Sequence, residues 1–163
     1  YNPSKKFFIA RFSNFYGKFQ PNYRLIPKTI LSIIKKKKIL IHGDGSSKRN
    51  YIYSEDFSEG ILKILTCKNN SQVYHFAGTK LYSVQDIVKK ISKIMKVDYK
   101  KIVKFTVDRK GKDQVYSLNC SKTMRQLGWS PKVNLDAGIK KIIKYIENNK
   151  ILVDKRPNNF VLD

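Results

Sequence analysis

The sequence is poor in the residues that build several common kinds of site. It holds 2 cysteines and 2 histidines in 163 residues, with no CxxC pair and no metal-ligand spacing. We therefore expect no metal site and no disulfide, and we expect Cys67 and Cys120 to be buried free thiols. It also lacks an uncharged apolar run of the roughly 20 residues that span a bilayer, and it lacks the start of a signal peptide. These absences predict a cytoplasmic protein that does not bind a membrane.

Acidic residues are scarce as well, with 12 against 34 basic residues and a net charge of +22. Such a charge favours polyanionic partners if it is clustered. Most of the basic residues, however, are lysines scattered along the whole chain, and only six are arginines. A compositional bias towards Lys, Ile, Asn, Tyr and Phe explains this pattern without nucleic acid, so we do not expect a nucleic-acid partner. A basic binding module remains the alternative.

Short apolar runs alternate with helical patterns, and this alternation predicts an α/β fold. The expected strands are residues 7–12, 39–42, 51–53, 72–76 and 103–107. The expected helices are residues 25–34, 84–95, 121–128 and 136–147, with a further helix that begins after Ser54 as its cap. Residues 108–114 form an expected loop, and the tail from residue 150 to 163 has no period and is expected to be peripheral.

Local signals sharpen two of these elements. Ser83 and Asp86 have the spacing of a capping box at the start of the helix over 84–95. Gly128 ends the helix that Ser121 opens, and Trp129 after it is expected to be a packing anchor.

The first strand ends in a polar segment, Ser13-Asn14-Phe15-Tyr16-Gly17, which we interpret as a turn. Ligands of open α/β sheets bind at the carboxyl ends of the strands. Asn14 is therefore a candidate ligand contact, and an ordinary turn residue is the alternative.

Taken in order, the polar segments form a wider pattern. It consists of Arg11-Phe-Ser-Asn14-Phe-Tyr16-Gly17, Arg24-Leu25-Ile26-Pro27, His42-Gly-Asp-Gly45, Arg49-Asn-Tyr51-Ile-Tyr53-Ser-Glu-Asp56, His75-Phe76-Ala77-Gly78, Asp108-Arg109-Lys110-Gly111-Lys112-Asp113, Tyr116 and Leu127-Gly128-Trp129-Ser130-Pro131. This pattern resembles the extended short-chain dehydrogenase/reductase superfamily, and most closely its dTDP-glucose 4,6-dehydratases. The resemblance runs from Phe7 to Asn149.

The resemblance implies a Rossmann-type enzyme with a site for a nucleoside-diphosphate sugar, dTDP-glucose. It implies that Asn14 contacts the sugar and that Arg49 binds the diphosphate, for which a planar guanidinium is well suited. The other implied substrate-binding residues are Arg24 and Leu25 over the nucleotide sugar, Leu40 and His42 beside the base, His75, and Arg109, Lys112 and Tyr116 on the nucleotide side.

Each of these roles has a structural alternative. Arg49 could pair with Glu55 or Asp56 instead. The segment with Arg109 and Lys112 could be a solvated loop, and His42 and His75, which replace a Tyr and an Asn more usual in the family, could be structural histidines.

The resemblance also implies NAD as cofactor, a homodimeric full-length enzyme, and a catalytic Tyr with a Lys four residues later on a helix. No GxxGxxG motif for the cofactor occurs in the sequence. Tyr1 and Lys5 have the catalytic spacing, but Pro3 between them disfavours a helix, and we assign no catalytic residue. Because the chain starts with Tyr1, we expect it to be the distal part of a longer enzyme: the last strands of a dinucleotide-binding sheet and the lobe that binds the nucleotide sugar. A UDP-sugar epimerase or decarboxylase is the alternative activity.

Overall fold

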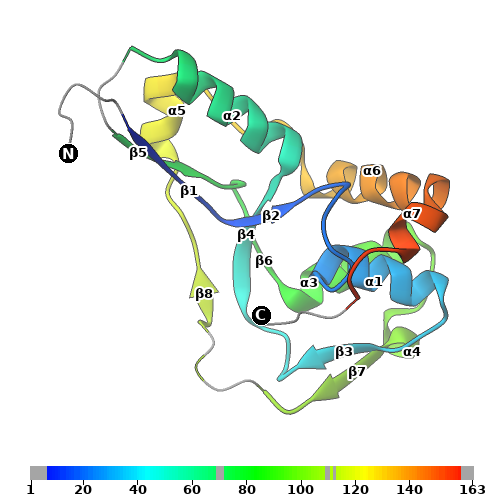
Figure 1. Cartoon of the computed structure of the whole chain (residues 1–163). Helices are drawn as coiled ribbons and strands as arrows, with labels where there is room; N and C mark the ends of the chain where they lie inside the picture. The colour runs from blue at the N-terminus through cyan, green and yellow to red at the C-terminus, as the bar shows by residue number, and fades with distance from the viewer. Residues whose placement is uncertain (1–6, 69–71, 109–110, 112, 159–163) are drawn as a thin grey trace.

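The computed structural model describes residues 7–68, 72–108, 111 and 113–158 of the chain. It shows the α/β fold expected from the sequence (Figure 1). Its strands are β1 (Phe8–Phe12), β2 (Asn14–Tyr16), β3 (Ile39–His42), β4 (Lys48–Tyr53), β5 (Gln72–Phe76), β6 (Leu81–Ser83), β7 (Val103–Thr106) and β8 (Val115–Tyr116). Its helices are α1 (Leu25–Ile34), α2 (Ser54–Thr66), α3 (Val84–Ile94), α4 (Tyr99–Ile102), α5 (Ser121–Leu127), α6 (Leu135–Asn148) and α7 (Lys150–Asp154).

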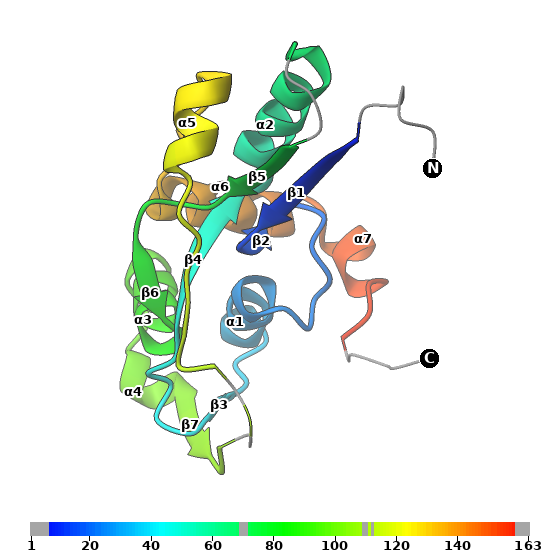
Figure 2. The ribbon, with the colours of Figure 1, turned by 90° about the vertical axis from the view of Figure 1, so that its left-hand side faces the viewer.

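Parallel strand pairs dominate the described sheets. β1 pairs with β5, β2 with β4, and β3 with β7, all in parallel. β4 also pairs with β6 in antiparallel and with β8 in parallel orientation. Figure 2 shows β1, β5, α2 and α5 at one end of the molecule and β3, β7 and α4 at the other, with α1 and α3 between them.

The chain changes its pairing partner at Ser13. β1 and β2 are separated by this one residue, yet β1 pairs with β5 and β2 pairs with β4. The backbone N–H of Ser13 donates to the carbonyl of Phe76 at 3.0 Å, which is the last bond to the β5 side. Ser13 is 3% exposed. A strand that changes partner opens a crevice at the carboxyl ends of the strands, where ligands bind in open α/β sheets.

Two large apolar clusters flank this point. The first joins β2 and β4 to α1, α3 and α6, and includes Tyr16, Ile30 and Ile139. The second joins β5 to α2 and α5, and includes Phe76 and Trp129. Trp129 is 1% exposed, its indole N–H donates to the carbonyl of Asp56 at 2.8 Å, and its ring meets Phe76 edge-on at 4.9 Å. The expected packing role of Trp129 is confirmed.

Most expected elements are present, and the differences are local. The helix over 25–34, the strand over 39–42 and the capping box of Ser83 and Asp86 are confirmed. Ser54 is not a cap, because it is the first residue of α2 and Tyr53 precedes the helix without a side-chain cap bond. The polar turn expected after β1 is wrong, since Asn14 begins β2. Cys120 is buried, while Cys67 is only half-buried, which corrects that expectation.

The first residues of the tail form a helix. Residues 150–154 form α7, and Val153 is 1% exposed in the first cluster. Ile151 and Leu152 of the same helix are exposed, so the expectation of a peripheral tail stays a prediction.

Candidate functional site

A cavity of about 660 Å³ opens where β1 passes into β2. It is lined by residues 12–21 and 24–26 and by Tyr51, Ser54 and Tyr116. Its volume lies within the range of cofactor and ligand pockets, about 300–1,000 Å³. Gly17 in its wall is required by close packing, because a Cβ there would lie 2.3 Å from the Ser54 hydroxyl oxygen.

Asn14 and Tyr51 form the polar centre of this cavity. They lie opposite each other in the parallel pairing of β2 with β4, and both line the cavity. Burial raises the pKa of the Tyr51 hydroxyl, while the hydrogen bond with Asn14 and the nearby Arg49 charge counteract it. Tyr51 is therefore held as a neutral phenol that can donate to a ligand oxygen. Sequence reasoning singled out Asn14 but missed Tyr51.

Arg49 lies two residues before Tyr51 on β4, so both side chains are on the same face of the strand. Its guanidinium donates to the carbonyls of Lys48 at 2.8 Å and Asp113 at 2.7 Å. The expected alternative, a pair with Glu55 or Asp56, is not what the structure shows. Glu55 contacts Lys18 at 3.6 Å and Lys141 at 2.6 Å, and the Asp56 carboxylate accepts from the N–H of Val133 at 2.9 Å. Within the described part of the chain, Arg49 makes no ion pair with a carboxylate. It is not among the residues that line the cavity.

The start of α1 adds to the positive character of the cavity. Arg24 is the N-cap residue of α1, and Arg24, Leu25 and Ile26 line the cavity. The first N–H groups of a helix have no partner within the helix, and the helix dipole is positive there. The first turn of α1 contains no acidic residue that would neutralise this end. Together with Arg24 and Arg49, it favours a ligand with negative charge.

Of the remaining predicted site residues, one lines the cavity, three lie elsewhere in the described structure, and two lie outside the described residues. Tyr116 lines the cavity and lies opposite Arg49 in the pairing of β8 with β4. Leu40 and His42 share one face of β3 but are not among the residues that line the cavity. Nδ1 of His42 lies 3.3 Å from the carbonyl oxygen of Val107. The predicted contact of Leu40 and His42 with a base remains a prediction.

His75 lies in β5, on the other side of the partner change. Its backbone N–H donates to the Thr123 hydroxyl at 2.9 Å, and its Nδ1 lies 3.3 Å from the carbonyl oxygen of Asn119. It does not line the cavity. Arg109 and Lys112, like Tyr1 and Lys5, lie outside the residues that the structure describes.

The described residues contain one turn with two glycines of positive φ, Gly43-Asp44-Gly45, and this turn does not fit the pyrophosphate of a dinucleotide. A Cβ at Gly43 would lie 2.5 Å from the carboxyl carbon of Asp108, so this turn faces a carboxylate, which repels phosphate. The described residues contain no group of three His, Cys, Asp or Glu that could hold a metal ion. None of the helices in the described ranges is long and apolar enough to cross a membrane.

The family model for GDP-mannose 4,6 dehydratase matches residues 1–142. A trifunctional UDP-glucose 4,6-dehydratase, epimerase and reductase of Arabidopsis thaliana is 35% identical over 140 residues, which cover 86% of this chain and 21% of that protein. The chain thus spans only a fifth of this relative.

Solved structures agree with the sequence match. The dTDP-glucose 4,6-dehydratase of Streptomyces venezuelae, with NAD bound, has a TM-score of 0.84 at 26% identity over 89% of this chain and 45% of that one. The UDP-glucose 4-epimerase of Thermotoga maritima, with UDP-glucose, has a TM-score of 0.83 at 26% identity over 89% of this chain and 47% of that one. The Rossmann-type fold expected from the resemblance is confirmed. The relatives described here are nucleotide-sugar dehydratases and epimerases. The chain belongs to the GDP-mannose 4,6 dehydratase family.

Proposed function

We propose that this chain is the nucleotide-sugar-binding part of an NAD-dependent 4,6-dehydratase that converts dTDP-glucose to dTDP-4-keto-6-deoxyglucose. The observation that carries the proposal is the cavity itself. It joins a neutral hydrogen-bonding pair, Asn14 and Tyr51, to the cationic Arg24 and the N-terminus of α1, with Arg49 beside them. A sugar offers hydroxyls to the first pair, and a diphosphate offers charge to the second group.

In this proposal NAD supplies oxidation and reduction of the sugar, and it is held by a part of the enzyme beyond the described residues. The residues of this chain bind and orient the substrate. Tyr51 and Asn14 fix the sugar by hydrogen bonds, and Arg49 fixes the diphosphate by a charge-assisted bond. The position of the sugar relative to the reacting groups follows from these contacts.

The free edge of β1 supports the expectation of a longer, two-part enzyme. Among the described strands, β1 pairs only with β5, and Phe7 and Ile9 beside this edge are each more than 40% exposed. Parallel sheets are normally covered on both faces and continued by neighbouring strands. We therefore propose that the sheet continues into a cofactor-binding part, and that the full-length enzyme is a cytoplasmic homodimer.

The test is the affinity of Arg49→Ala for dTDP, measured by calorimetry on the chain, with Arg125→Ala on the exposed face of α5 as the control. A hydrogen bond to a charged group is worth about 1.5–3 kcal/mol, so we expect roughly 10-fold to 100-fold weaker binding by Arg49→Ala. The control should bind like the unaltered chain. Equal affinity of all three proteins would exclude the diphosphate role of Arg49.

A related UDP-sugar enzyme is the second candidate, because relatives of this chain include a UDP-glucose dehydratase and a UDP-glucose epimerase. Calorimetry with UDP beside dTDP separates the two, since the tighter ligand identifies the base. Strong, salt-sensitive binding to DNA with no affinity for either nucleotide would instead support a basic binding module and overturn the proposal.

A further inference from the structure

The loop from Gly17 to Arg24, called here the cavity loop, connects β2 to α1 and forms one wall of the cavity. Within its main chain, the bonds are few: the N–H of Gln20 donates to Gly17 at 3.3 Å, and that of Arg24 donates to Pro21 at 3.1 Å. Irregular loops with few internal bonds open at low free energy. Other contacts must therefore hold this wall in shape.

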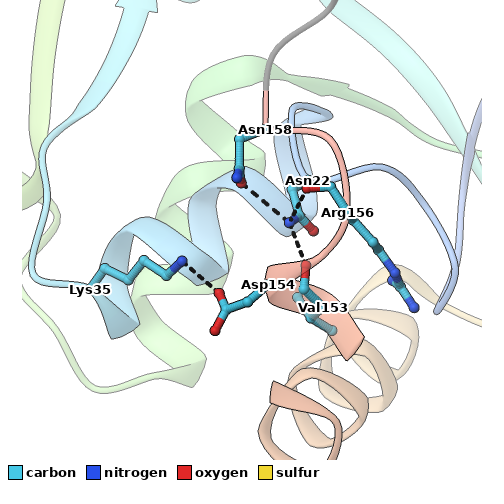
Figure 3. A network of polar contacts seen from close by, with 6 residues as sticks. All are labelled: Asn22, Lys35, Val153, Asp154, Arg156 and Asn158. Atoms are coloured by element: carbon cyan, nitrogen blue, oxygen red, sulfur yellow. Dashed lines mark hydrogen bonds and ion pairs between the residues drawn. The ribbon is translucent and has the colours of Figure 1, made fainter. Parts of the chain in front are cut away.

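The segment 150–158 supplies such contacts, although it lies beyond the residues that the family model matches. Asn22 is 3% exposed, and its Nδ2 donates to the carbonyl of Val153 at 2.7 Å (Figure 3). The same nitrogen lies 3.4 Å from the carbonyl oxygen of Arg156 and 3.3 Å from Oδ1 of Asn158. Through these bonds, the buried Asn22 joins the middle of the loop to the tail.

Arg156 joins the first part of the loop to α6. Its Nη1 donates to the carbonyl of Lys18 at 2.8 Å, and its Nη2 donates to the Tyr145 hydroxyl at 2.6 Å. Its guanidinium also lies 5.6 Å from the ring centre of Phe19 and 5.2 Å from that of Tyr145. One side chain therefore contacts two loop residues that line the cavity and the helix behind them.

The tail itself is anchored independently of the loop. Val153 is buried among the residues of the first cluster, and Asp154 forms a 2.7 Å ion pair with Lys35 at the end of α1. The tail is thus a fixed support against which the loop can be held.

We propose that Asn22 and Arg156 are positioning residues, which hold the cavity loop in the shape that binds the nucleotide sugar; this role rests on the function proposed above. They act through Lys18, Phe19 and the loop backbone and do not contact the substrate. The C-terminal segment is accordingly part of the binding site's framework in this protein.

Hydrogen exchange on the chain tests the proposal, with Arg156→Ala and Asn22→Ala compared with Lys155→Ala, an exposed neighbour in the tail. We expect the amides of Gln20 and Arg24 to exchange about tenfold faster or more in the first two variants, as loss of a bond worth roughly 1.5 kcal/mol requires. The amides of β5, at the other end of the molecule, should exchange as in the unaltered chain. Arg156→Lys, which keeps the charge and one donor to Lys18, should lie between.

Unchanged exchange at Gln20 and Arg24 in both variants would overturn the proposal. So would equal acceleration in β5, because that would show a loss of global stability. If Arg156→Ala does not fold, Asn22→Ala and Arg156→Lys decide by the same measurement. Calorimetry with dTDP and UDP separates this result from the function: an unaltered chain that binds neither nucleotide refutes the proposed function, while exchange alone still decides whether the tail holds the loop.

Discussion

β1 and β2 form one nearly continuous stretch of chain, but different forces stabilise the pairing of β1 with β5 and that of β2 with β4. Behind β5, Phe76 contacts Phe57 at 5.7 Å and Trp129 at 4.9 Å between ring centres, which is an apolar, aromatic environment. Between β2 and β4, Asn14 and Tyr51 lie opposite each other beside an open cavity, and the guanidinium of the nearby Arg49 donates to backbone carbonyls. The first pair is a packing element, while the second leaves polar groups accessible to a ligand.

The contrast shows that the polar side chains accessible to a ligand lie on the β2–β4 pair. β1 holds the chain in register with β5, and the residues after Ser13 then divide their roles. Tyr16 is buried in the first cluster, while Asn14 is exposed and lines the cavity. Three substitutions test this division of roles.

The largest effect is expected for Trp129→Ala, on the packing side. Removing a fully buried large aromatic side chain costs about 3–5 kcal/mol of unfolding free energy, and here the indole bond to Asp56 is lost as well. Trp129→Phe should cost clearly less, because most of the contact with Phe76 remains. Urea denaturation measures both. A cost below about 1 kcal/mol for the alanine variant would contradict the packing role.

A smaller effect is expected for Gly78→Ala, which should disturb both the β1–β5 pair and the β2–β4 pair. Gly78 follows β5, and a Cβ there would lie 2.1 Å from the carbonyl oxygen of Tyr51 in β4. Because Tyr51 lies within β4 and the Gly78 carbonyl accepts from Asn50 of the same strand at 2.9 Å, we expect an overpacking cost of about 1–3 kcal/mol and weaker dTDP binding through displacement of Tyr51. Thr79→Ala, at the exposed next position, is the control. Unfolding in urea and calorimetry measure the two effects, and dTDP affinity unchanged by Gly78→Ala would show that the pairs are independent.

The smallest effect is expected for Tyr53→Phe, at the end of β4. Tyr53 is 1% exposed, and its hydroxyl makes no hydrogen bond within the described residues. Removing a buried hydroxyl without a partner should stabilise the fold by up to about 1 kcal/mol. Tyr116→Phe, at an exposed position, should change stability little and serves as the control.

The same substitution should change the pH dependence of stability. Burial, with the carboxylates of Glu55 and Asp56, raises the pKa of Tyr53 from 10.0 to about 12. The unfolded chain therefore releases this proton first, so the stability contributed by Tyr53 is complete below pH 10 and is lost as the pH rises towards 12. Tyr53→Phe should lose less stability than the unaltered chain between pH 9 and pH 11.5. An identical loss in both proteins would show that Tyr53 does not titrate in this way.

Sequence periodicity was sufficient for most of the fold but not for its short strands. α1, with its apolar residues at helical spacing, and the capping box of α3 were predictable because their signals are local. β2 and β8 have three and two residues, too few for a period, and they exist because β4 pairs with them. Tertiary pairing of this kind has no local signal.

The site was predictable to a similar extent. Asn14, Arg24, Leu25 and Tyr116 were selected from the pattern of polar segments, and the structure brings them to one cavity. Tyr51 was missed because a tyrosine in a strand normally packs, and only its pairing with Asn14 shows otherwise. The alternation of Arg49, Tyr51 and Tyr53 on one face of β4 was the signal that could have found it.

The single residue between β1 and β2 has a consequence for how the protein unfolds. Ser13 lies where the two apolar clusters meet. The cavity walls include Tyr16 of the first cluster and Phe12, whose ring centre lies 4.8 Å from that of Phe57, beside the second cluster. A ligand in this cavity would touch both halves of the core at once. Saturation with nucleotide should therefore stabilise both halves of the core together and raise the melting temperature.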